Sequence, residues 1–461
     1  MSSSVDFVLV RTRNHPDPEF FTPEEFRNVA SEARQFPPFG ILNIQSYLRK
    51  HGFTTKVLDR FRPEYHGLSA EEFAGIIRGF RPRFIGFSSL TSQADDAAAI
   101  ARALKGRTDA KVVLGGVHFS ALFKAGLEVA DYVVVGDGEV ACLKLCRGEA
   151  PASGLIVGET LDDLDEVPRP TREELDETAW SPKESARFKI NTARGCPFDC
   201  YFCKDGVRDS AVRMHSVEYV ADYFKFVVDT YGLTEFYVLD DIFLPNPERL
   251  EAYIRAFAER KIKVDIKCFL HPNTVKPNLL PLYKELGVRV VSLGIESGSN
   301  DILRKMGKRI TTDVARQAVD DLHRFGFETN GLFMLGHREE TEETMRQTVE
   351  FVRELSPKLS SFWVSFMAPY PGTPMYDAGI DTYGKILNPD YSKWGNRYPV
   401  FLPKGLTYDQ LMEARRHLLF VRRDLEKRKV VASKGYARYY LQSARTKVKR
   451  LANGVRRLVR A

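Results

Sequence analysis

The sequence of 461 residues lacks the features that place a protein in a membrane or outside the cell. No apolar run is long enough to span a bilayer, and the N-terminus has no basic segment followed by an apolar run, as a secretory signal would. Six cysteines in a chain of this length do not suggest a disulfide framework. No internal repeat or low-complexity tract is present. We therefore expect a cytoplasmic globular protein of two or three domains.

Acidic residues are almost missing from the last part of the chain, which accounts for the net charge of +7. Residues 414–461 hold sixteen Lys and Arg against two acids, whereas residues 1–413 are mildly acidic. Residues 418–431 and 436–459 are apolar at helical spacing, so this tail predicts basic amphipathic helices. Such a helix binds an anionic membrane surface or nucleic acid, or it packs on the protein with its Lys and Arg in solvent. The tail does not resemble an RNA-binding fold, so nucleic acid is the least favoured partner.

Strand and helix signals alternate from the N-terminus to about residue 150. Such alternation is typical of an α/β fold with a doubly wound, Rossmann-like parallel sheet. Glycine-rich turns at Gly115-Gly116 and Gly136-Asp137-Gly138-Glu139 follow two of the strands, and ligands of such sheets bind at the carboxyl ends of strands. The expected strands are 5–10, 55–58, 84–88, 111–114 and 132–135, and the expected helices are 41–51, 94–104 and 121–129.

The alternation stops between residues 151 and 185, which are rich in Pro, Asp and Glu and suit an extended linker on the surface. It restarts at residue 186, where six strands with helical crossovers fit an open, partial (β/α)6 barrel with its active site at the carboxyl ends of the strands. The predicted order is a first domain (1–150), a linker (151–185), a core (186–400) and a basic helical C-terminal region (401–461). The expected core strands are 188–190, 236–239, 265–269, 288–293, 331–335 and 362–367.

Three cysteines in one short run, Cys196, Cys200 and Cys203, carry the strongest chemical signal. Three thiolates on one loop can hold three irons of a cubane 4Fe–4S cluster, because soft sulfur ligands suit such clusters, and the fourth iron is left for a small molecule. The alternative is a structural zinc site completed by Cys268 or His215. Zinc sites usually pair their ligands as C-x2-C units or add an H-x3-H unit, and the spacing C-x3-C-x2-C has neither. We therefore favour the cluster.

With Phe202 directly before the third cysteine, the run resembles the signature of the radical S-adenosylmethionine (SAM) superfamily. The resemblance implies SAM on the open iron and its reductive cleavage to methionine and a 5′-deoxyadenosyl radical that abstracts hydrogen from a substrate. It also implies an electron donor such as flavodoxin or ferredoxin. Phe202 matches the aromatic position that covers the adenine, although a buried core aromatic has the same appearance in sequence.

Two further segments at the ends of predicted strands are similar to the same superfamily. Asp240 and Asp241 stand where the core contacts the SAM amino group. They can also serve a substrate as acid or base, cap a helix, or lie in solvent. Glu296 and Ser297, in Gly294-Ile295-Glu296-Ser297-Gly298-Ser299, match a segment that approaches SAM. The resemblance therefore implies that Glu296 and Ser297 bind this cofactor.

Loops after the last two strands complete the candidate site. His337 lies in Gly336-His337-Arg338-Glu339-Glu340-Thr341, where the superfamily has G-L-P-G-E-T, so the loop is more polar than the pattern predicts. That departure indicates either a polar substrate or surface drift. Tyr370 follows the last strand in Pro369-Tyr370-Pro371-Gly372 and is expected to face the pocket. His337 and Tyr370 therefore join Asp240 and Asp241 as candidate catalytic residues.

The first domain resembles the cobalamin (B12)-binding domain found ahead of many radical SAM cores. The resemblance implies cobalamin as a further cofactor, with Ser88, Gly116, His118 and Gly136 as candidate binding residues. No D-x-H-x-x-G motif occurs, so no histidine is evident as a ligand of the cobalt, and a domain that has lost cobalamin would look much the same. His118 faces the corrin or caps a turn. The matching stretches are 37–41, 47–52, 85–89, 115–118 and 136–139.

The two resemblances together imply an enzyme that acts on a small molecule. The leading hypothesis is cobalamin-dependent methyl transfer to an unactivated carbon or phosphorus. The alternative is a cobalamin-independent radical dehydration, deoxygenation or rearrangement of a polyhydroxylated sugar or aminoglycoside, which the polar residues at 240–241 and 337–340 would suit. A third hypothesis, from another class, is a membrane- or nucleic-acid-associated binding protein with a structural metal.

Overall fold

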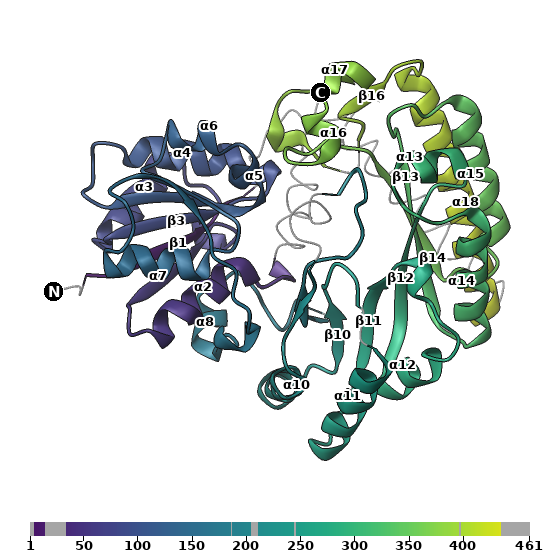
Figure 1. The fold of residues 1–461 in the computed structure, drawn as a ribbon, viewed down its shortest axis with the longest axis horizontal. Helices are drawn as coiled ribbons and strands as arrows, with labels where there is room; N and C mark the ends of the chain where they lie inside the picture. Colours follow the sequence, from purple (N-terminus) through teal and green to yellow (C-terminus); the bar gives the residue numbers. More distant parts are fainter. Residues whose placement is uncertain are drawn as a thin grey trace, which may run out of the picture.

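Two six-stranded parallel sheets, each with helices packed on it, dominate the molecule (Figure 1). The computed structural model describes residues 4–13, 34–185, 187–203, 211–243, 246–395 and 398–434. The first unit, purple to blue, lies on the left of the view, and the second, teal to yellow, lies on the right. The chain therefore forms two α/β units in sequence order, as the alternation of strand and helix signals predicts.

The first sheet has the strand order β2-β1-β3-β4-β5-β6, from β1 (Phe7–Arg11), β2 (Thr55–Asp59), β3 (Phe84–Ser88), β4 (Lys111–Gly115), β5 (Tyr132–Val135) and β6 (Gly154–Val157). Its helices are α2 (Phe39–Lys50), α3 (Ala70–Gly79), α4 (Ala94–Leu104), α5 (Gly116–Ala121), α6 (Phe123–Leu127) and α7 (Glu139–Arg147). Successive side chains of a strand point to opposite faces. Val8 and Val10 pack with α3 and α4, whereas Phe7 and Leu9 pack with α2 and α7, so both faces are covered.

The segment after residue 150 is not an extended linker on the surface, because it packs against both units. β6 pairs with β5 beyond the predicted domain boundary, and a short helix, α8 (Arg172–Asp176), packs on α2. The apolar side chains spaced through the segment, such as Leu164, Leu175 and Trp180, are buried. The composition rich in proline and acids hides these few apolar residues, which are enough to anchor the segment.

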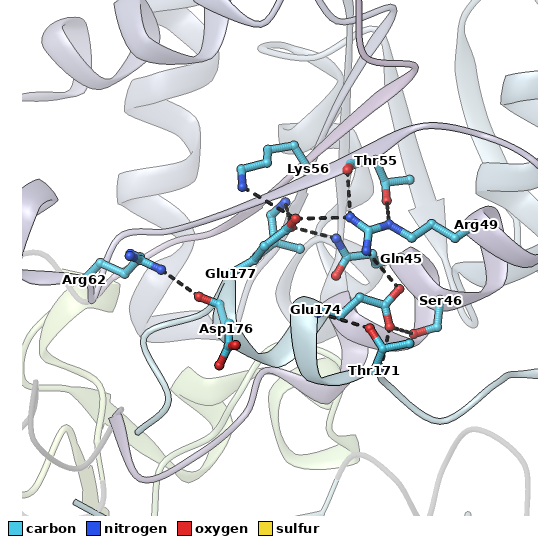
Figure 2. A network of polar contacts seen from close by, with 11 residues as sticks. Gln45, Ser46, Arg49, Thr55, Lys56, Arg62, Thr171, Glu174, Asp176 and Glu177 are labelled. Carbon is cyan, nitrogen blue, oxygen red and sulfur yellow. Dashed lines mark hydrogen bonds and ion pairs between the residues drawn. The ribbon is translucent and has the colours of Figure 1, made fainter. Parts of the chain in front are cut away.

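A polar network attaches this segment to β2, the edge strand of the first sheet (Figure 2). Glu177 accepts a hydrogen bond from the backbone N–H of Val57 in β2 (2.8 Å) and forms an ion pair with Arg49 of α2 (3.1 Å). The buried carboxylate of Glu174 accepts a hydrogen bond from Ser46 Oγ at 2.8 Å. The network therefore occupies an edge N–H that could otherwise pair with another chain.

The second sheet has the strand order β14-β13-β12-β11-β10-β7, so its strands follow one another across the sheet in sequence order. This is the arrangement of the partial (β/α)6 barrel that the sequence predicts. The strands are β7 (Phe188–Ile190), β10 (Glu235–Val238), β11 (Asp265–Leu270), β12 (Val288–Glu296), β13 (Glu328–Leu335) and β14 (Ser361–Phe366). The helices are α10 (Val217–Tyr231), α11 (Pro247–Glu259), α12 (Leu280–Leu286), α13 (Asn300–Lys305), α14 (Thr312–Arg324) and α15 (Glu342–Leu355), and their apolar residues pack with the strands in one large core.

After β14 the chain returns to the first unit. This segment contains α16 (Pro374–Asp377), α17 (Ile380–Tyr383) and the antiparallel pair β15 (Gly384–Ile386) and β16 (Phe401–Pro403), near the top of Figure 1. Tyr391, which lies between the two strands in sequence, packs edge-on against His118 of α5, with ring centroids 5.0 Å apart. The segment therefore bridges the two units.

A long helix, α18 (Tyr408–Lys434), then packs on α15 and β14. The helix predicted over residues 418–431 is confirmed as part of α18, and the helix predicted over 436–459 lies outside the described residues. In the part of the chain that the structure describes, no helix is long and apolar enough to cross a membrane.

Candidate cofactor and substrate site

The three cysteines lie on the loop that follows β7, at the carboxyl end of the second sheet. Cys196 and Cys200 are buried, with 9% and 7% of their surface exposed, and Cys203 is half-buried. Burial raises the pKa of the Cys200 thiol to about 11, and the nearby Lys308 ammonium opposes that rise. No disulfide joins any cysteine of the described residues. The three thiols therefore remain available as ligands.

The surroundings of the loop fit an iron–sulfur cluster better than a zinc ion. Within the described ranges, no three His, Cys, Asp or Glu side chains converge on a single ion. Cys268 is fully buried in the core on β11, and His215 Nδ1 is 2.9 Å from Asp165 Oδ1, so neither completes a zinc site with the loop. Three cysteine side chains on one loop are the ligand set of a cubane cluster with one open iron.

The segment after α13 packs against the cysteine loop. Tyr201 donates its backbone N–H to the Met306 carbonyl (2.8 Å), and an ion pair joins Arg309 to Asp199 (2.7 Å). Phe198 stacks on His271, at the end of β11, with ring centroids 3.9 Å apart. Contacts from the segment after α13 and from the end of β11 therefore hold the loop in place.

Lys308 is a buried cation beside the cysteine loop that sequence reasoning missed. Its ammonium is 3.1 Å from Glu296 Oε1 and 6.0 Å from the Phe202 ring centroid. Burial opposes the charge, but the Glu296 carboxylate raises the pKa of Lys308 above its ordinary value. The sequence has only a weak signal for Lys308, the short Met306-Gly307-Lys308-Arg309 stretch. A lysine in a loop normally lies in solvent, so its burial could not be predicted.

Glu296 reaches Lys308 because the end of β12 is irregular. The register between β12 and β13 shifts between Gly294 and Glu296, and Glu296 has a φ of +70°. A non-glycine residue in this region is strained, and such strain is common at functional sites. Ser297 is fully buried, with its hydroxyl 3.1 Å from Thr348 Oγ1, so it shapes the turn. Of the two residues, only Glu296 presents its side chain beside the cysteine loop.

Asp240 and Asp241 occupy different environments. Asp240 is 2% exposed and accepts hydrogen bonds from the backbone N–H groups of Thr192 (2.6 Å) and Ala193 (3.1 Å) and from the Thr192 hydroxyl. Burial raises the pKa of Asp240 to about 7. Burial raises the pKa of the Cys196 thiol, and the charge of the exposed Asp241 adds a smaller rise. Asp240 therefore braces the start of the cysteine loop, and Asn246 rather than either aspartate caps α11.

His337, the residue predicted in the polar loop after β13, points into the protein interior. His337 is fully buried, its Nδ1 is 2.7 Å from the Arg338 carbonyl oxygen, and burial lowers the pKa of His337 to about 4. Glu340 is buried too, and the absence of solvent raises its pKa to about 8. Arg338, which the sequence did not single out, donates to the Tyr201 hydroxyl at 2.6 Å. The loop therefore contacts the cysteine loop through Arg338 rather than through His337.

Two aromatic residues of the candidate site pack against the bridging segment. Phe202 is half-buried and packs with Met367, Met375 and Phe401. Tyr370 packs against Trp394, with ring centroids 6.1 Å apart. The predicted contacts of Phe202 with SAM and of Tyr370 with the substrate therefore stay predictions.

A cavity of about 440 Å³ lies at the carboxyl edge of the first sheet. Its lining combines apolar strand residues with glycine turns and includes Ser88, Gly116 and Gly136, whereas His118 is not among its lining residues. Gly116 has a φ of +84°, and a Cβ there would lie only 2.6 and 2.7 Å from the backbone N and O of Ser89. Apolar walls with a glycine rim fit part of a corrinoid, which has an apolar ring system and a polar phosphate.

The comparisons agree with both halves of this description. The family model of the radical SAM superfamily matches residues 190–352, and that of the B12 binding domain matches residues 28–145. The chain is a radical SAM enzyme. It belongs to the radical SAM proteins that carry a B12-binding domain ahead of the radical SAM domain.

Relatives cover most of the chain. It is 28% identical to the uncharacterized methyltransferase PH0819 of Pyrococcus horikoshii over 81% of this chain and 85% of that protein. It is 25% identical to the anaerobic magnesium-protoporphyrin IX monomethyl ester cyclase of Cereibacter sphaeroides over 86% of this chain and 68% of that protein. The radical SAM methyltransferase TsrM of Kitasatospora setae, solved with cobalamin and a 4Fe–4S cluster bound, has a TM-score of 0.68 at 16% identity, over 91% and 89% of the two chains. This last likeness shows that the folds agree over both domains.

Proposed function

We propose that this enzyme transfers a methyl group to an unactivated carbon or phosphorus of a small molecule, with a 4Fe–4S cluster, SAM and cobalamin as cofactors. One observation carries the proposal. Arg194, two residues before Cys196, lines the cavity of the B12-binding domain together with Asp137 and Glu139 of that domain. The cobalamin-binding cavity and the cluster loop thus meet at one interface, as the use of both cofactors on one substrate requires.

The chain's own residues divide the work of binding and orientation. When bound, the cluster with SAM supplies radical chemistry and the corrinoid supplies a methyl carrier. Cys196, Cys200 and Cys203 would hold the cluster. The ion pair of Glu296 and Lys308 offers one carboxylate and one ammonium to the zwitterionic amino-acid part of SAM, since charge-assisted hydrogen bonds are the stronger ones.

We extend the proposal to the substrate class and to the remaining partners. A relative named as a methyltransferase supports a methyl acceptor, and the matches reported above do not favour dehydration of a sugar. We keep a flavodoxin or ferredoxin as the electron donor, and an anionic membrane surface as the partner of the basic tail.

Anaerobic reconstitution with iron, sulfide and hydroxocobalamin, followed by desalting, reduction and addition of SAM, tests the proposal. We expect a retained corrin spectrum, and both 5′-deoxyadenosine and S-adenosylhomocysteine by mass spectrometry when a methyl acceptor is present. Retained iron without corrin, together with 5′-deoxyadenosine alone, would contradict methyl transfer through cobalamin and return attention to dehydration or rearrangement.

A further inference from the structure

Two arginines stand at the base of the cysteine loop, one on each strand of a short antiparallel pair. The pair consists of β8 (Ala193–Arg194) and β9 (Arg213–Met214), and we call it the neck. The loop that carries the cysteines leaves and returns through the neck. Any shift between the two strands would therefore move the loop.

Both arginines reach the same carboxylate of the B12-binding domain. Asp137 Oδ2 is 2.9 Å from Arg213 Nη2 and 3.4 Å from Arg194 Nη1. Arg194 also donates to Glu139 Oε1 at 2.6 Å, and Glu139 is only 3% exposed. Two acids from one turn of the first domain thus tie together the two strands of the neck. The pair of Arg194 with Glu139 is costly to break, because removing Arg194 leaves the buried Glu139 charge without this partner.

The segment between the domains holds the neck from a second side. Arg213 Nη1 donates to the Leu161 carbonyl at 2.9 Å. Directly after β9, His215 Nδ1 lies 2.9 Å from Asp165, and Ser216 donates its backbone N–H to the same carboxylate at 3.1 Å. These contacts to the neck therefore come from residues that precede the radical SAM core.

The turn that supplies Asp137 and Glu139 is also a wall of the cavity. Gly136, Asp137, Gly138 and Glu139 all line it, as does Arg194. The turn is tightly packed from behind, because a Cβ on Gly158 would collide with the Asp137 carbonyl oxygen. A closely packed turn transmits a displacement instead of absorbing it. A ligand in the cavity and the neck of the cysteine loop therefore act on the same side chains.

We infer that occupation of the cavity by cobalamin and ordering of the cysteine loop for its cluster are energetically coupled through Asp137, Glu139, Arg194 and Arg213. The inference rests on the proposed use of both cofactors and makes these four positioning residues. Coupling between two sites is reciprocal, so the cluster strengthens corrin binding by the same factor by which the corrin strengthens cluster binding. Such couplings typically amount to about 5- to 150-fold in affinity.

The test compares hydroxocobalamin affinity in two states of the full chain, by anaerobic visible titration. One state carries the reconstituted cluster, and the other is the Cys196→Ala/Cys200→Ala/Cys203→Ala variant. We expect the cluster-loaded protein to bind at least about fivefold more tightly, and the Asp137→Asn/Glu139→Gln variant to bring the ratio of the two affinities close to one. As the reciprocal readout, hydroxocobalamin should slow iron loss to a chelator in the original protein and not in the variant.

Two further variants keep the test decisive. Glu71→Gln, which removes an exposed ion pair to Arg107 in the same domain, should leave the affinity ratio unchanged. Arg194→Lys keeps the charge but loses the planar guanidinium that contacts two acids, so it should give an intermediate affinity ratio. This variant takes the place of the double variant if the double variant fails to fold. Circular dichroism and the thermal midpoint establish that each variant is folded.

The outcomes separate the coupling from the proposed function. A ratio near one in the original protein, or an unchanged ratio in the Asp137→Asn/Glu139→Gln and Arg194→Lys variants, would overturn the coupling while leaving cobalamin-dependent methyl transfer intact. Complete absence of hydroxocobalamin binding would overturn both. Coupled binding without any methyl transfer would support the inference and contradict the proposed reaction.

Discussion

The two sheets of this protein are alike in strand number and direction, yet they offer ligands very different surfaces. In the first, β1 is buried on both faces by helices, and a cavity opens at the carboxyl edge with its glycine turns. In the second, β13 alternates buried and partly exposed residues, which leaves its inner face accessible. The first sheet therefore offers a ligand the backbone of its glycine turns, and the second offers side chains on its inner face. The predictions below test this difference.

The largest effect should come from replacing a cysteine of the second unit, compared with one of the first. Cys200→Ala removes a ligand from the loop and should abolish retention of an intact cluster and all SAM cleavage, measured by iron analysis and 5′-deoxyadenosine formation. The matched control is Cys146→Ala in α7, a buried cysteine of the first sheet. It should keep the cluster and lower the free energy of unfolding by about 1 kcal/mol. Cluster loss in this control would contradict the division of roles.

The second unit should give stability a pH dependence through Glu340. Burial raises the pKa of Glu340 to about 8, so the folded protein holds a proton that the unfolded chain releases near its ordinary value of 4.5. The contribution of Glu340 to the free energy of unfolding is then complete below about pH 4.5. It falls by about 3 to 5 kcal/mol as the pH rises toward 8. Glu340→Gln should flatten that slope in urea unfolding of the apoprotein at pH 5 to 9. An unchanged slope would show that Glu340 is ionised in the fold.

The glycine rim of the first sheet can be tested by adding one methyl group. In Gly116→Ala the Cβ would lie within 2.7 Å of the Ser89 backbone at a φ of +84°, which should cost about 3 kcal/mol. Hydroxocobalamin affinity should fall at least tenfold. Gly148→Ala has a similar φ of +74° but no atom within 4 Å of its Cβ, so it should cost about 1 kcal/mol and leave that affinity unchanged. Equal affinity losses would argue against a cofactor at the rim.

The smallest expected effect concerns the buried ion pair of the second unit. Lys308→Met removes the ammonium beside Glu296 and should weaken SAM binding about tenfold, or about 1.4 kcal/mol. Equilibrium dialysis with the oxidised, cluster-loaded protein would measure it. Lys305→Met provides a control, because Lys305 pairs with the more exposed Asp301 and Glu339. Tighter SAM binding in Lys308→Met would contradict the role proposed for the pair.

Much of the fold followed from local patterns in the sequence. The strands predicted at 84–88, 132–135 and 188–190 have the bounds of β3, β5 and β7, and the helix at 94–104 has those of α4. Continuous apolar runs and clear glycine turns marked these elements, because each strand end is also a change in local composition. The prediction for 151–185 failed for the opposite reason, since its few apolar residues are buried only where the folded segment meets the cores of the two units.

The candidate site divides along the same line. The cysteine run and the glycine turns are contiguous motifs whose chemistry depends on residues close in sequence. The roles of Asp240 and His337 depended on burial. Arg338 depended on Tyr201, 137 residues away, and Lys308 on Glu296 across the end of β12. At none of these four positions does the local sequence show whether the residue supports the cysteine loop or binds a cofactor or substrate.

The sequence by itself determined the order of the two α/β units and the radical SAM family, and it predicts the cluster ligands, because all three depend on spacing along the chain. The tertiary structure alone decided that Asp137 and Glu139 grip the neck of the cysteine loop and that Glu296 meets Lys308. These contacts join separate parts of the chain, and a charge has no partner until folding removes water and brings the opposite charge within a few ångströms.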